Sequence, residues 1–384
     1  MWPVGREAER ALRVLMGMPE GASLGGPAAC EPPFVAELRR LGLEIAEETY
    51  VYGERLSGTT LRQRVGRVLR TARRLRQRLR STQFDVLHLN SSFDARAVLR
   101  DAITLGLIRR SRIKTFVKFH GSDADLLRTN DPVLRRFTRT LLARADGIGL
   151  LSTEEKENFM RAGVSERRLF VVKNVVTTEP YPSDGAARLR AQLQVADDVP
   201  LLLFIARFIP AKGLVDVVRA CAILRERGLS FRLLCVGDGP ARVAAEAEVA
   251  ALRLRPHAQF FGYVPEAETR AFYAGSTLLV FPTYHYEGFP MVIFKALAAG
   301  LPIITTRIRA ARDYLREPDN CLWVEPRNPE ALAEQIARLL REPELRAAMA
   351  DNNRALAQQF NAQTVAPEYV AVYNQLLKER KEAN

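Results

Sequence analysis

The sequence contains few cysteines, and they form no pattern. Cys30, Cys221, Cys235 and Cys321 are scattered singly among 384 residues, and no two stand at the C-x-x-C spacing of a zinc site or a redox motif. This excludes a disulfide framework and a structural metal site built from cysteines. We interpret all four as reduced packing residues in a cytosolic protein.

Long apolar runs are absent too. No run reaches the roughly 20 residues that a membrane-spanning helix needs. Residues 1–19 have charges scattered before only a short apolar stretch, which is not typical of a secretory signal. We therefore expect a cytoplasmic protein without a spanning helix. Internal repeats and low-complexity segments are also missing, so a repeat architecture is not expected.

Acidic residues are missing from one segment. Residues 62–80 contain nine arginines and no Asp or Glu, and apolar residues recur between them at helical spacing. Residues 1–180 hold 32 Lys and Arg against 21 Asp and Glu, a net charge of +11, whereas residues 181–384 hold 25 against 23, a net charge of +2. The stretch Leu61–Arg80 predicts a basic amphipathic helix, whose outer face is either merely solvated or bound to an anionic membrane surface. No aromatic-rich motif accompanies the charge, so we expect no nucleic-acid partner.

The chain is too long for one ordinary hydrophobic core. Short apolar strands alternate with longer helical stretches, which is typical of parallel sheets covered on both faces. The predicted strands are 12–18, 85–90, 115–121, 147–152, 169–174, 200–207, 231–237, 258–263, 277–282, 302–306 and 321–326. A stretch rich in proline and small polar residues, 177–190, is the best candidate for a linker. We predict two doubly wound α/β domains with a cleft between them.

The segment 287–304, EGFPMVIFKALAAGLPII, joins a carboxylate to an apolar helix. Pro290 suits the first helical position, and unpaired N–H groups near Phe289, Met291 and Val292 would form an anion site at the helix N-terminus. Glu287 precedes that site and could accept hydrogen bonds from a ligand rich in hydroxyls. The alternative is a buried helix start capped by Glu287. Lys295 is the one charge in the helix, so it must meet an acid, solvent or a bound anion.

Two further strand ends carry candidate binding residues. Arg207 and Lys212 lie five positions apart where a strand passes into a helix, and two such cations can converge on one diphosphate; alternatively, both are solvated. The strand end LCVGDGP contains Gly237, Asp238 and Gly239, and glycines there let a ligand approach the backbone.

In this order and spacing, these elements and the strand-to-loop junction FFGYVP, 260–265, resemble the retaining glycosyltransferases of family 4, which have the GT-B fold of two Rossmann-like domains. The resemblance is strongest over residues 201–306. It continues through HGSD at 120–123, VVKNVV at 171–176 and SLGGP at 23–27, the last resembling the family's first glycine-rich loop at Gly25 and Gly26.

The resemblance implies a role for each matching residue. Arg207 and Lys212 would bind the diphosphate of the donor, while Tyr263 and Val264 would lie at the nucleobase. His120 would contact the donor sugar. Glu287 and the backbone of the segment Gly288, Phe289, Pro290, Met291 and Val292 would hold the sugar and phosphates. The domains would be 1–178, which binds the acceptor, and 179–364, which binds the nucleotide sugar, with the final helix 365–384 packing back on the first domain.

The sequence departs from the family at three points. Ala206 stands where the family has glycine before the diphosphate arginine. RIRAARD, 307–313, replaces a usual pair of glycines. Lys295 replaces the family's second glutamate, which contacts the ribose of the nucleotide, so we hypothesise that Lys295 donates a hydrogen bond where the glutamate would accept one.

We therefore predict a retaining glycosyltransferase of polysaccharide biosynthesis, peripheral to the inner face of the membrane. It would move a sugar from a nucleoside-diphosphate sugar to a glycan, lipid-linked or small-molecule acceptor. No cofactor or metal is expected; the DxD at Asp123 and Asp125 lies in the other half of the chain from Arg207 and Lys212. One alternative is a related protein with impaired donor binding that acts as a glycan- or lipid-binding module. The other is a sugar-nucleotide epimerase of the same fold.

Overall fold

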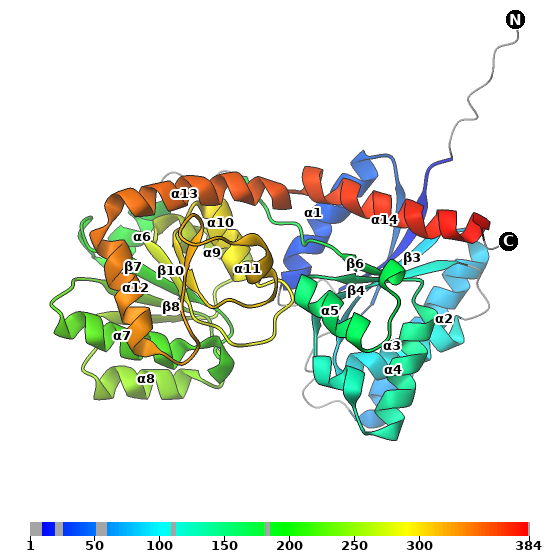
Figure 1. Ribbon diagram of the computed structural model, residues 1–384, viewed down its shortest axis with the longest axis horizontal. Coiled ribbons are helices and arrows are strands. Elements are labelled where there is room, and N and C mark those ends of the chain that lie inside the picture. Colours follow the sequence, from blue (N-terminus) through cyan, green and yellow to red (C-terminus); the bar gives the residue numbers. More distant parts are fainter. Residues whose placement is uncertain are drawn as a thin grey trace, which may run out of the picture. The chain divides into compact units, whose positions relative to one another are not determined.

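The computed structural model describes residues 10–19, 26–50, 60–108, 113–179, 181 and 185–382. The chain divides into two compact units. Unit 1 comprises residues 1–175 and 362–384, and unit 2 comprises residues 176–361. Each unit contains a parallel sheet between layers of helices, so the predicted pair of doubly wound α/β domains is confirmed (Figure 1).

The sheet of unit 1 has the strand order β2-β1-β3-β4-β5-β6, and all neighbouring strands are parallel. Its inner strands are almost wholly buried, as their continuous apolar runs require. The strands are β1 (Arg13–Met18), β2 (Glu44–Thr49), β3 (Val86–Phe93), β4 (Lys114–Ser122), β5 (Gly147–Leu150) and β6 (Leu169–Val171).

The helices of unit 1 form two layers (Figure 1). α1 and α14 pack together, while α3 packs between α2 and α4. α2 begins with a capping box, in which Thr60 and Gln63 satisfy each other's backbone N–H groups. The helices are α1 (Gly26–Arg40), α2 (Leu61–Ser81), α3 (Ala95–Leu107), α4 (Pro132–Arg144), α5 (Thr153–Arg161) and α14 (Ala362–Glu382), with short 3₁₀ turns η1 (Ala124–Arg128) and η2 (Glu166–Arg168).

The last helix, α14, is built into the core of unit 1 although it is remote in sequence. Tyr369 and Tyr373 are completely buried. The hydroxyl of Tyr373 lies 2.6 Å from Nδ1 of His88 on β3, and that of Tyr369 donates to the carbonyl of Lys173 at 2.8 Å. Two buried aromatic side chains with satisfied hydroxyls fix the C-terminal helix to this sheet.

The sheet of unit 2 has the strand order β12-β11-β10-β7-β8-β9 and is also parallel. The order reverses between β10 and β7, and ligands bind such sheets at the carboxyl ends of the strands beside this switch point. The strands are β7 (Leu201–Ile205), β8 (Arg232–Val236), β9 (Ala258–Gly262), β10 (Leu278–Phe281), β11 (Ile303–Thr305) and β12 (Cys321–Trp323).

The helices of unit 2 cover both faces of its sheet (Figure 1). α7 packs between α8 and α12, whereas α6, α9, α10 and α13 form the second layer. Helix α6 begins at Gly185, so the end of the predicted linker is helical. The helices are α6 (Gly185–Leu193), α7 (Leu214–Glu226), α8 (Arg242–Ala251), α9 (Glu266–Gly275), α10 (Met291–Ala299), α11 (Arg309–Tyr314), α12 (Pro329–Arg341) and α13 (Pro343–Ala357), with turns η3 (Pro210–Lys212) and η4 (Gln358–Phe360).

Within the described ranges, every helix is too short or too polar to cross a bilayer.

Candidate functional site

The loops after β7, β8 and β9 are hydrogen-bonded to one another at the carboxyl edge of the unit 2 sheet. The N–H of Phe208 donates to the carbonyl of Asp238 at 2.8 Å, and the N–H of Gly237 donates to the carbonyl of Gly262 at 2.8 Å. Gly237 has a φ of +131°, and a Cβ there would lie 1.8 Å from the carbonyl oxygen of Ala206. A glycine is therefore required at the strand end predicted to approach a ligand.

The loop after β10 is held against the turn η3. The N–H of Tyr284 donates to the carbonyl of Ala211 at 2.8 Å, and the hydroxyl of Thr283 donates to the same carbonyl at 3.3 Å. Gly213 has a φ of +81°, and a Cβ there would lie 2.7 Å from the carbonyl oxygen of Pro282. These contacts bring two segments some 70 residues apart in sequence together at the switch point of the sheet.

Lys212 and Glu287 form an ion pair at this junction. The Lys212 side chain is only 4% exposed and its ammonium lies 5.2 Å from the ring centroid of Phe281, while the Glu287 side chain is 32% exposed. Burial lowers the pKa of Lys212, the Glu287 carboxylate opposes that shift, and the charge of Arg207 adds to it. An ammonium has three donors, so Lys212 can hold Glu287 and a ligand oxygen together.

The region around this ion pair has a positive potential. Burial lowers the pKa of His285, and the charges of Lys212, Arg207 and Arg309 lower it further, against the opposing effect of Glu287. Arg207 is exposed at the end of β7. The structure thus brings both predicted diphosphate ligands and the predicted carboxylate into one electrostatic environment suited to an anion.

Helix α10 begins at Met291, four positions after Glu287. Pro290 is its N-cap, so the first helical residue is Met291 and not the proline. Phe289 stacks on Phe294 with a centroid separation of 3.6 Å, a hydrophobic staple that fixes the direction in which the chain enters the helix. The helix dipole places partial positive charge at this end, beside Gly288 and Val292, which further favours an anion.

The predicted nucleobase and ribose residues lie around the start of α9. Tyr263 is 57% exposed and Val264 is half-buried. Lys295 forms an ion pair with Glu266, and its backbone carbonyl accepts a hydrogen bond from the Tyr181 hydroxyl at 3.0 Å. Burial raises the pKa of Tyr181 to about 12. The structure thus gives Lys295 an acidic partner; its contact with a ribose stays a prediction.

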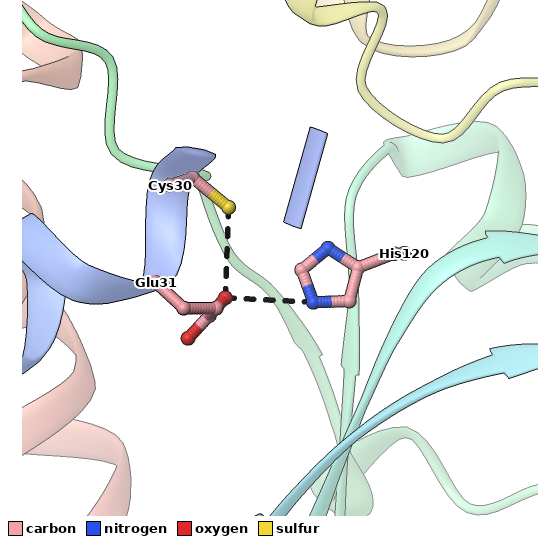
Figure 2. Close-up of side chains that lie close together, drawn as sticks. All are labelled: Cys30, Glu31 and His120. Atoms are coloured by element: carbon pink, nitrogen blue, oxygen red, sulfur yellow. Dashed lines mark hydrogen bonds and ion pairs between the residues drawn. The ribbon is translucent and has the colours of Figure 1, made fainter. Parts of the chain in front are cut away.

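His120 lies in a buried polar cluster of unit 1 (Figure 2). Its Nε2 lies 3.0 Å from Oδ1 of Asn90 and 3.4 Å from Oε1 of Glu31, and Lys118 donates to the same Glu31 oxygen at 2.8 Å. Burial lowers the pKa of His120 well below its ordinary value, and the charge of Lys118 lowers it further, so the imidazole is neutral at pH 7. Of the predicted glycines, Gly26 is the first residue of α1 and Gly25 lies outside the described residues.

In the described part of the chain, Cys30, Glu31 and His120 have potential metal ligands within 4.8 Å of one another (Figure 2). The Glu31 carboxylate is paired with the ammonium of Lys118, and burial raises the pKa of the Cys30 thiol. The DxD has a structural use, since Asp123 caps η1 through the N–H of Asp125 at 3.1 Å.

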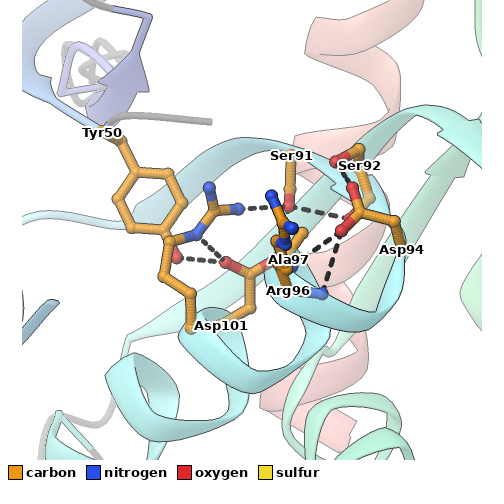
Figure 3. Close-up of polar contacts among 8 residues, drawn as sticks. Tyr50, Ser91, Ser92, Asp94, Arg96, Ala97 and Asp101 are labelled. Carbon is orange, nitrogen blue, oxygen red and sulfur yellow. Dashed lines mark hydrogen bonds and ion pairs between the residues drawn. The ribbon is translucent and has the colours of Figure 1, made fainter. Parts of the chain in front are cut away.

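A second buried network of unit 1 surrounds Asp101 (Figure 3). Its carboxylate accepts hydrogen bonds from Tyr50 at 2.5 Å, from Arg100 at 2.6 Å and from Ser91. The Arg100 guanidinium also lies 4.6 Å from the ring centroid of Tyr50. The acid is saturated by its own neighbours, so we interpret this network as structural.

Sequence reasoning missed Arg309 and His285. Arg309 is 2% exposed, and its charge acts on His285 beside the ion pair. The sequence did contain a signal for Arg309, because this cation follows strand β11 at the carboxyl edge of the unit 2 sheet, as Arg207 follows β7. Arg309 lies within RIRAARD, 307–313, which replaces the family's usual pair of glycines.

The two halves of the chain match two related sequence families. Residues 186–356 match the family described as "Glycosyl transferases group 1", and residues 33–180 match the family described as "Glycosyltransferase Family 4". One match therefore lies mostly in each structural unit.

Characterised relatives are glycosyltransferases as well. Alpha-D-kanosaminyltransferase of Streptomyces kanamyceticus is 24% identical over 254 residues, which make up 65% of this chain and 65% of that protein. The 2-deoxystreptamine glucosyltransferase of the same organism is 30% identical over 265 residues, 66% of this chain and 67% of that protein. The chain thus spans slightly less than two thirds of the length of the first and two thirds of the second.

A solved structure of similar fold is that of HepE from Anabaena in complex with UDP and glucose. It superposes with a TM-score of 0.73 at 18% identity, covering 94% of this chain and 99% of that one. At this identity the likeness shows the fold, which is GT-B. With both families matched and a relative at 30% identity, the chain belongs to the group 1 glycosyltransferases.

Proposed function

We propose that this enzyme transfers a sugar from a nucleoside-diphosphate sugar to a hydroxyl of an acceptor, with retention of anomeric configuration and without a metal ion. The observation that carries the proposal is the convergence of Arg207, Lys212 and Glu287 at the switch point of the unit 2 sheet, beside the N-terminus of α10. The glucose- and UDP-bound state of HepE supports a nucleotide-sugar donor.

The reaction needs stabilisation of a departing nucleoside diphosphate. The bond between the anomeric carbon and the β-phosphate oxygen breaks, and negative charge grows on that oxygen. Arg207 supplies a planar fork of donors and Lys212 a buried point charge, and the amides at the start of α10 add their partial charges. Because Lys212 is paired with Glu287, the net charge of +2 that balances the diphosphate comes from counting Arg207 and Arg309 beside this pair, and the site thus supplies the charge that a metal ion supplies elsewhere.

Glu287 is not the nucleophile in this proposal, so retention requires attack from the face that the diphosphate leaves. The Glu287 carboxylate is paired with Lys212, which makes it a poor nucleophile and suits it to accept hydrogen bonds from sugar hydroxyls. The acceptor oxygen would then attack the anomeric carbon from the face that the diphosphate leaves. The departing phosphate oxygen would take the acceptor's proton, which balances the reaction without a base from the protein.

The acceptor we propose is a glycan or lipid-linked sugar bound by unit 1, in polysaccharide biosynthesis at the inner face of the membrane. Helices α2, α3 and α4 lie side by side, and the one acid within them, Asp101, is completely buried. Their outer surface therefore presents arginines, which favours an anionic membrane surface.

One experiment tests the transfer itself. The protein is titrated calorimetrically with UDP and GDP and then incubated with the sugar nucleotide of whichever base binds, with and without EDTA and acceptor extracts. The proposal predicts acceptor-dependent release of nucleoside diphosphate that EDTA does not suppress, and a product of unchanged anomeric configuration by NMR. Conversion of the sugar nucleotide without acceptor would favour an epimerase. Binding of glycan but of no nucleotide would favour a binding module.

A further inference from the structure

An exposed tyrosine stands directly before the site carboxylate. Tyr286 is 74% exposed, although its neighbours Glu287 and His285 are each part of the charged site. The N–H of Glu287 donates to the carbonyl of His285 at 2.8 Å, so Tyr286 is the central residue of a tight turn. Glu287 contacts Lys212 and Tyr286 lies against Arg309, so adjacent residues of this turn present a carboxylate and an aromatic ring.

The guanidinium of Arg309 packs against one face of the Tyr286 ring. Its guanidinium carbon lies 5.6 Å from the centroid of Tyr286, and the residue is 2% exposed. The N–H of the next residue, Ala310, donates to the carbonyl of Gly288 at 3.3 Å, which fixes the start of α11 to the same loop. A cation over one face of a ring is attracted by its π-electrons and so holds the ring in place. The other face stays open, as the exposure of Tyr286 shows.

The backbone of Arg309 is strained. Its φ is +42°, a left-handed conformation that is unfavourable for a residue other than glycine. A glycine would adopt it freely. Strained residues of this kind gather at functional sites, where the surrounding structure holds them in place. The presence of arginine at this position indicates that its side chain has a use.

We propose that Tyr286, positioned by Arg309, stacks its open face on the sugar ring of the donor. The inference rests on the proposed function, because it takes the ligand to be a nucleoside-diphosphate sugar. Glu287 would accept hydrogen bonds from the sugar's hydroxyls, and the adjacent ring would cover the apolar C–H face of the same sugar. Tyr286 is then a binding residue and Arg309 a positioning residue.

The test compares each sugar nucleotide with its own nucleotide. Affinities for UDP-glucose, UDP, GDP-mannose and GDP are measured by calorimetry for the parent, Tyr286→Ala, Tyr286→Phe, Arg309→Gly and the double variant Tyr286→Ala/Arg309→Gly. We expect Tyr286→Ala to bind the sugar nucleotide three- to tenfold more weakly than the parent does, and to bind the nucleotide with an affinity within twofold of the parent's. Tyr286→Phe should bind both ligands like the parent. Arg309→Gly should weaken the sugar nucleotide more than the nucleotide, because it removes the support of the ring as well as a cation of the site. The ratio of these two losses should be no larger in the double variant than in Tyr286→Ala.

Tyr263→Ala is the matched control, since Tyr263 is the other strongly exposed tyrosine of the described unit 2 residues. It should change the affinities for nucleotide and sugar nucleotide by the same factor. Equal sugar-nucleotide binding by the parent and Tyr286→Ala would overturn the stacking role alone. A double variant in which the sugar-specific losses of the two single variants add would overturn the positioning role of Arg309. A parent that binds no nucleotide would overturn the proposed function together with this inference.

Discussion

The two units share one architecture but use their buried charges differently. In unit 1, Glu31 is paired with Lys118 and Asp101 with Arg100, and each acid is also bonded to neutral neighbours. In unit 2, Lys212 and Glu287 are paired within a region of positive potential, and the Glu287 side chain remains one third exposed. A buried pair whose charges satisfy each other is costly to break, whereas a partly exposed pair in an excess of one sign can bind a ligand.

The largest expected effect concerns the saturated pair of unit 1. Lys118→Met leaves the completely buried Glu31 without its cation, which should cost about 3–5 kcal/mol of unfolding free energy. Hydrogen exchange of strand β4 measures this loss. The double variant Lys118→Met/Glu31→Gln should recover most of it, and nucleotide affinity in unit 2 should not change. A loss below about 1 kcal/mol would show that the pair is not structural.

The second prediction concerns the arginines outside the core of unit 1. Each arginine near an anionic bilayer contributes about 1 kcal/mol. Replacing Arg67, Arg70, Arg74 and Arg78 by Gln should therefore abolish sedimentation with phosphatidylserine vesicles at low salt and leave nucleotide binding intact.

The control carries the same change of charge on exposed arginines of unit 2. It replaces Arg255, Arg312, Arg338 and Arg341. This variant should sediment like the parent. If both variants sediment equally, or if high salt has no effect, the membrane surface is not the partner of α2 and a soluble acceptor is favoured.

Third, Arg207→Ala and Lys212→Ala should each weaken nucleoside diphosphate binding by about 2 kcal/mol, roughly 30-fold, because each removes a charge-assisted contact. Nucleoside without phosphates should bind the variants and the parent alike. Because burial lowers the pKa of Lys212, the parent's affinity should also fall as the pH rises, starting below the ordinary lysine value. Equal losses for nucleoside and diphosphate would mean that both residues only support the fold.

Fourth, the two buried histidines of unit 1 should make it acid-sensitive. The pKa values of His88 and His120 in the folded protein are well below 6.5, chiefly because of burial. Below pH 6.5 the unfolded chain binds protons that the folded chain does not, so stability falls by about 1.4 kcal/mol per pH unit for each histidine. Hydrogen exchange of β3 at pH 7.5, 6.5 and 5.5 measures the slope, and His88→Gln should reduce it by half.

The smallest effect concerns Lys295. If it occupies the place of a ribose acceptor, Lys295→Glu should bind the preferred nucleotide severalfold more tightly, by about 1 kcal/mol, whereas Lys295→Ala should not. Glu266 lies opposite, so Lys295→Glu/Glu266→Lys keeps the ion pair and is the cleaner comparison. If neither variant with glutamate at position 295 binds the nucleotide more tightly than the parent, Lys295 serves only its ion pair with Glu266.

The sequence predicted the strands that have continuous apolar runs and missed β2. Residues 44–49 read EIAEET, with two apolar residues among three glutamates, and β2 is a half-exposed strand at the edge of its sheet. An edge strand buries little, so its pattern is weak. The basic helix was predicted at 61–80 and is observed at Leu61–Ser81. Its apolar periodicity runs along its whole length, and a capping box marks its N-terminal end.

For the site, the sequence determined which chemistry is available: cations after β7, a carboxylate before an apolar helix and glycines at strand ends. Those features are local, because each depends on a strand, a turn and a helix start. Only the tertiary structure decided which of these groups meet. It paired Lys212 with Glu287 across some 70 residues and Lys295 with Glu266, and it placed Arg309 under Tyr286. Such contacts depend on strand order and on how two loops pack, and neither is encoded in the spacing of residues along the chain.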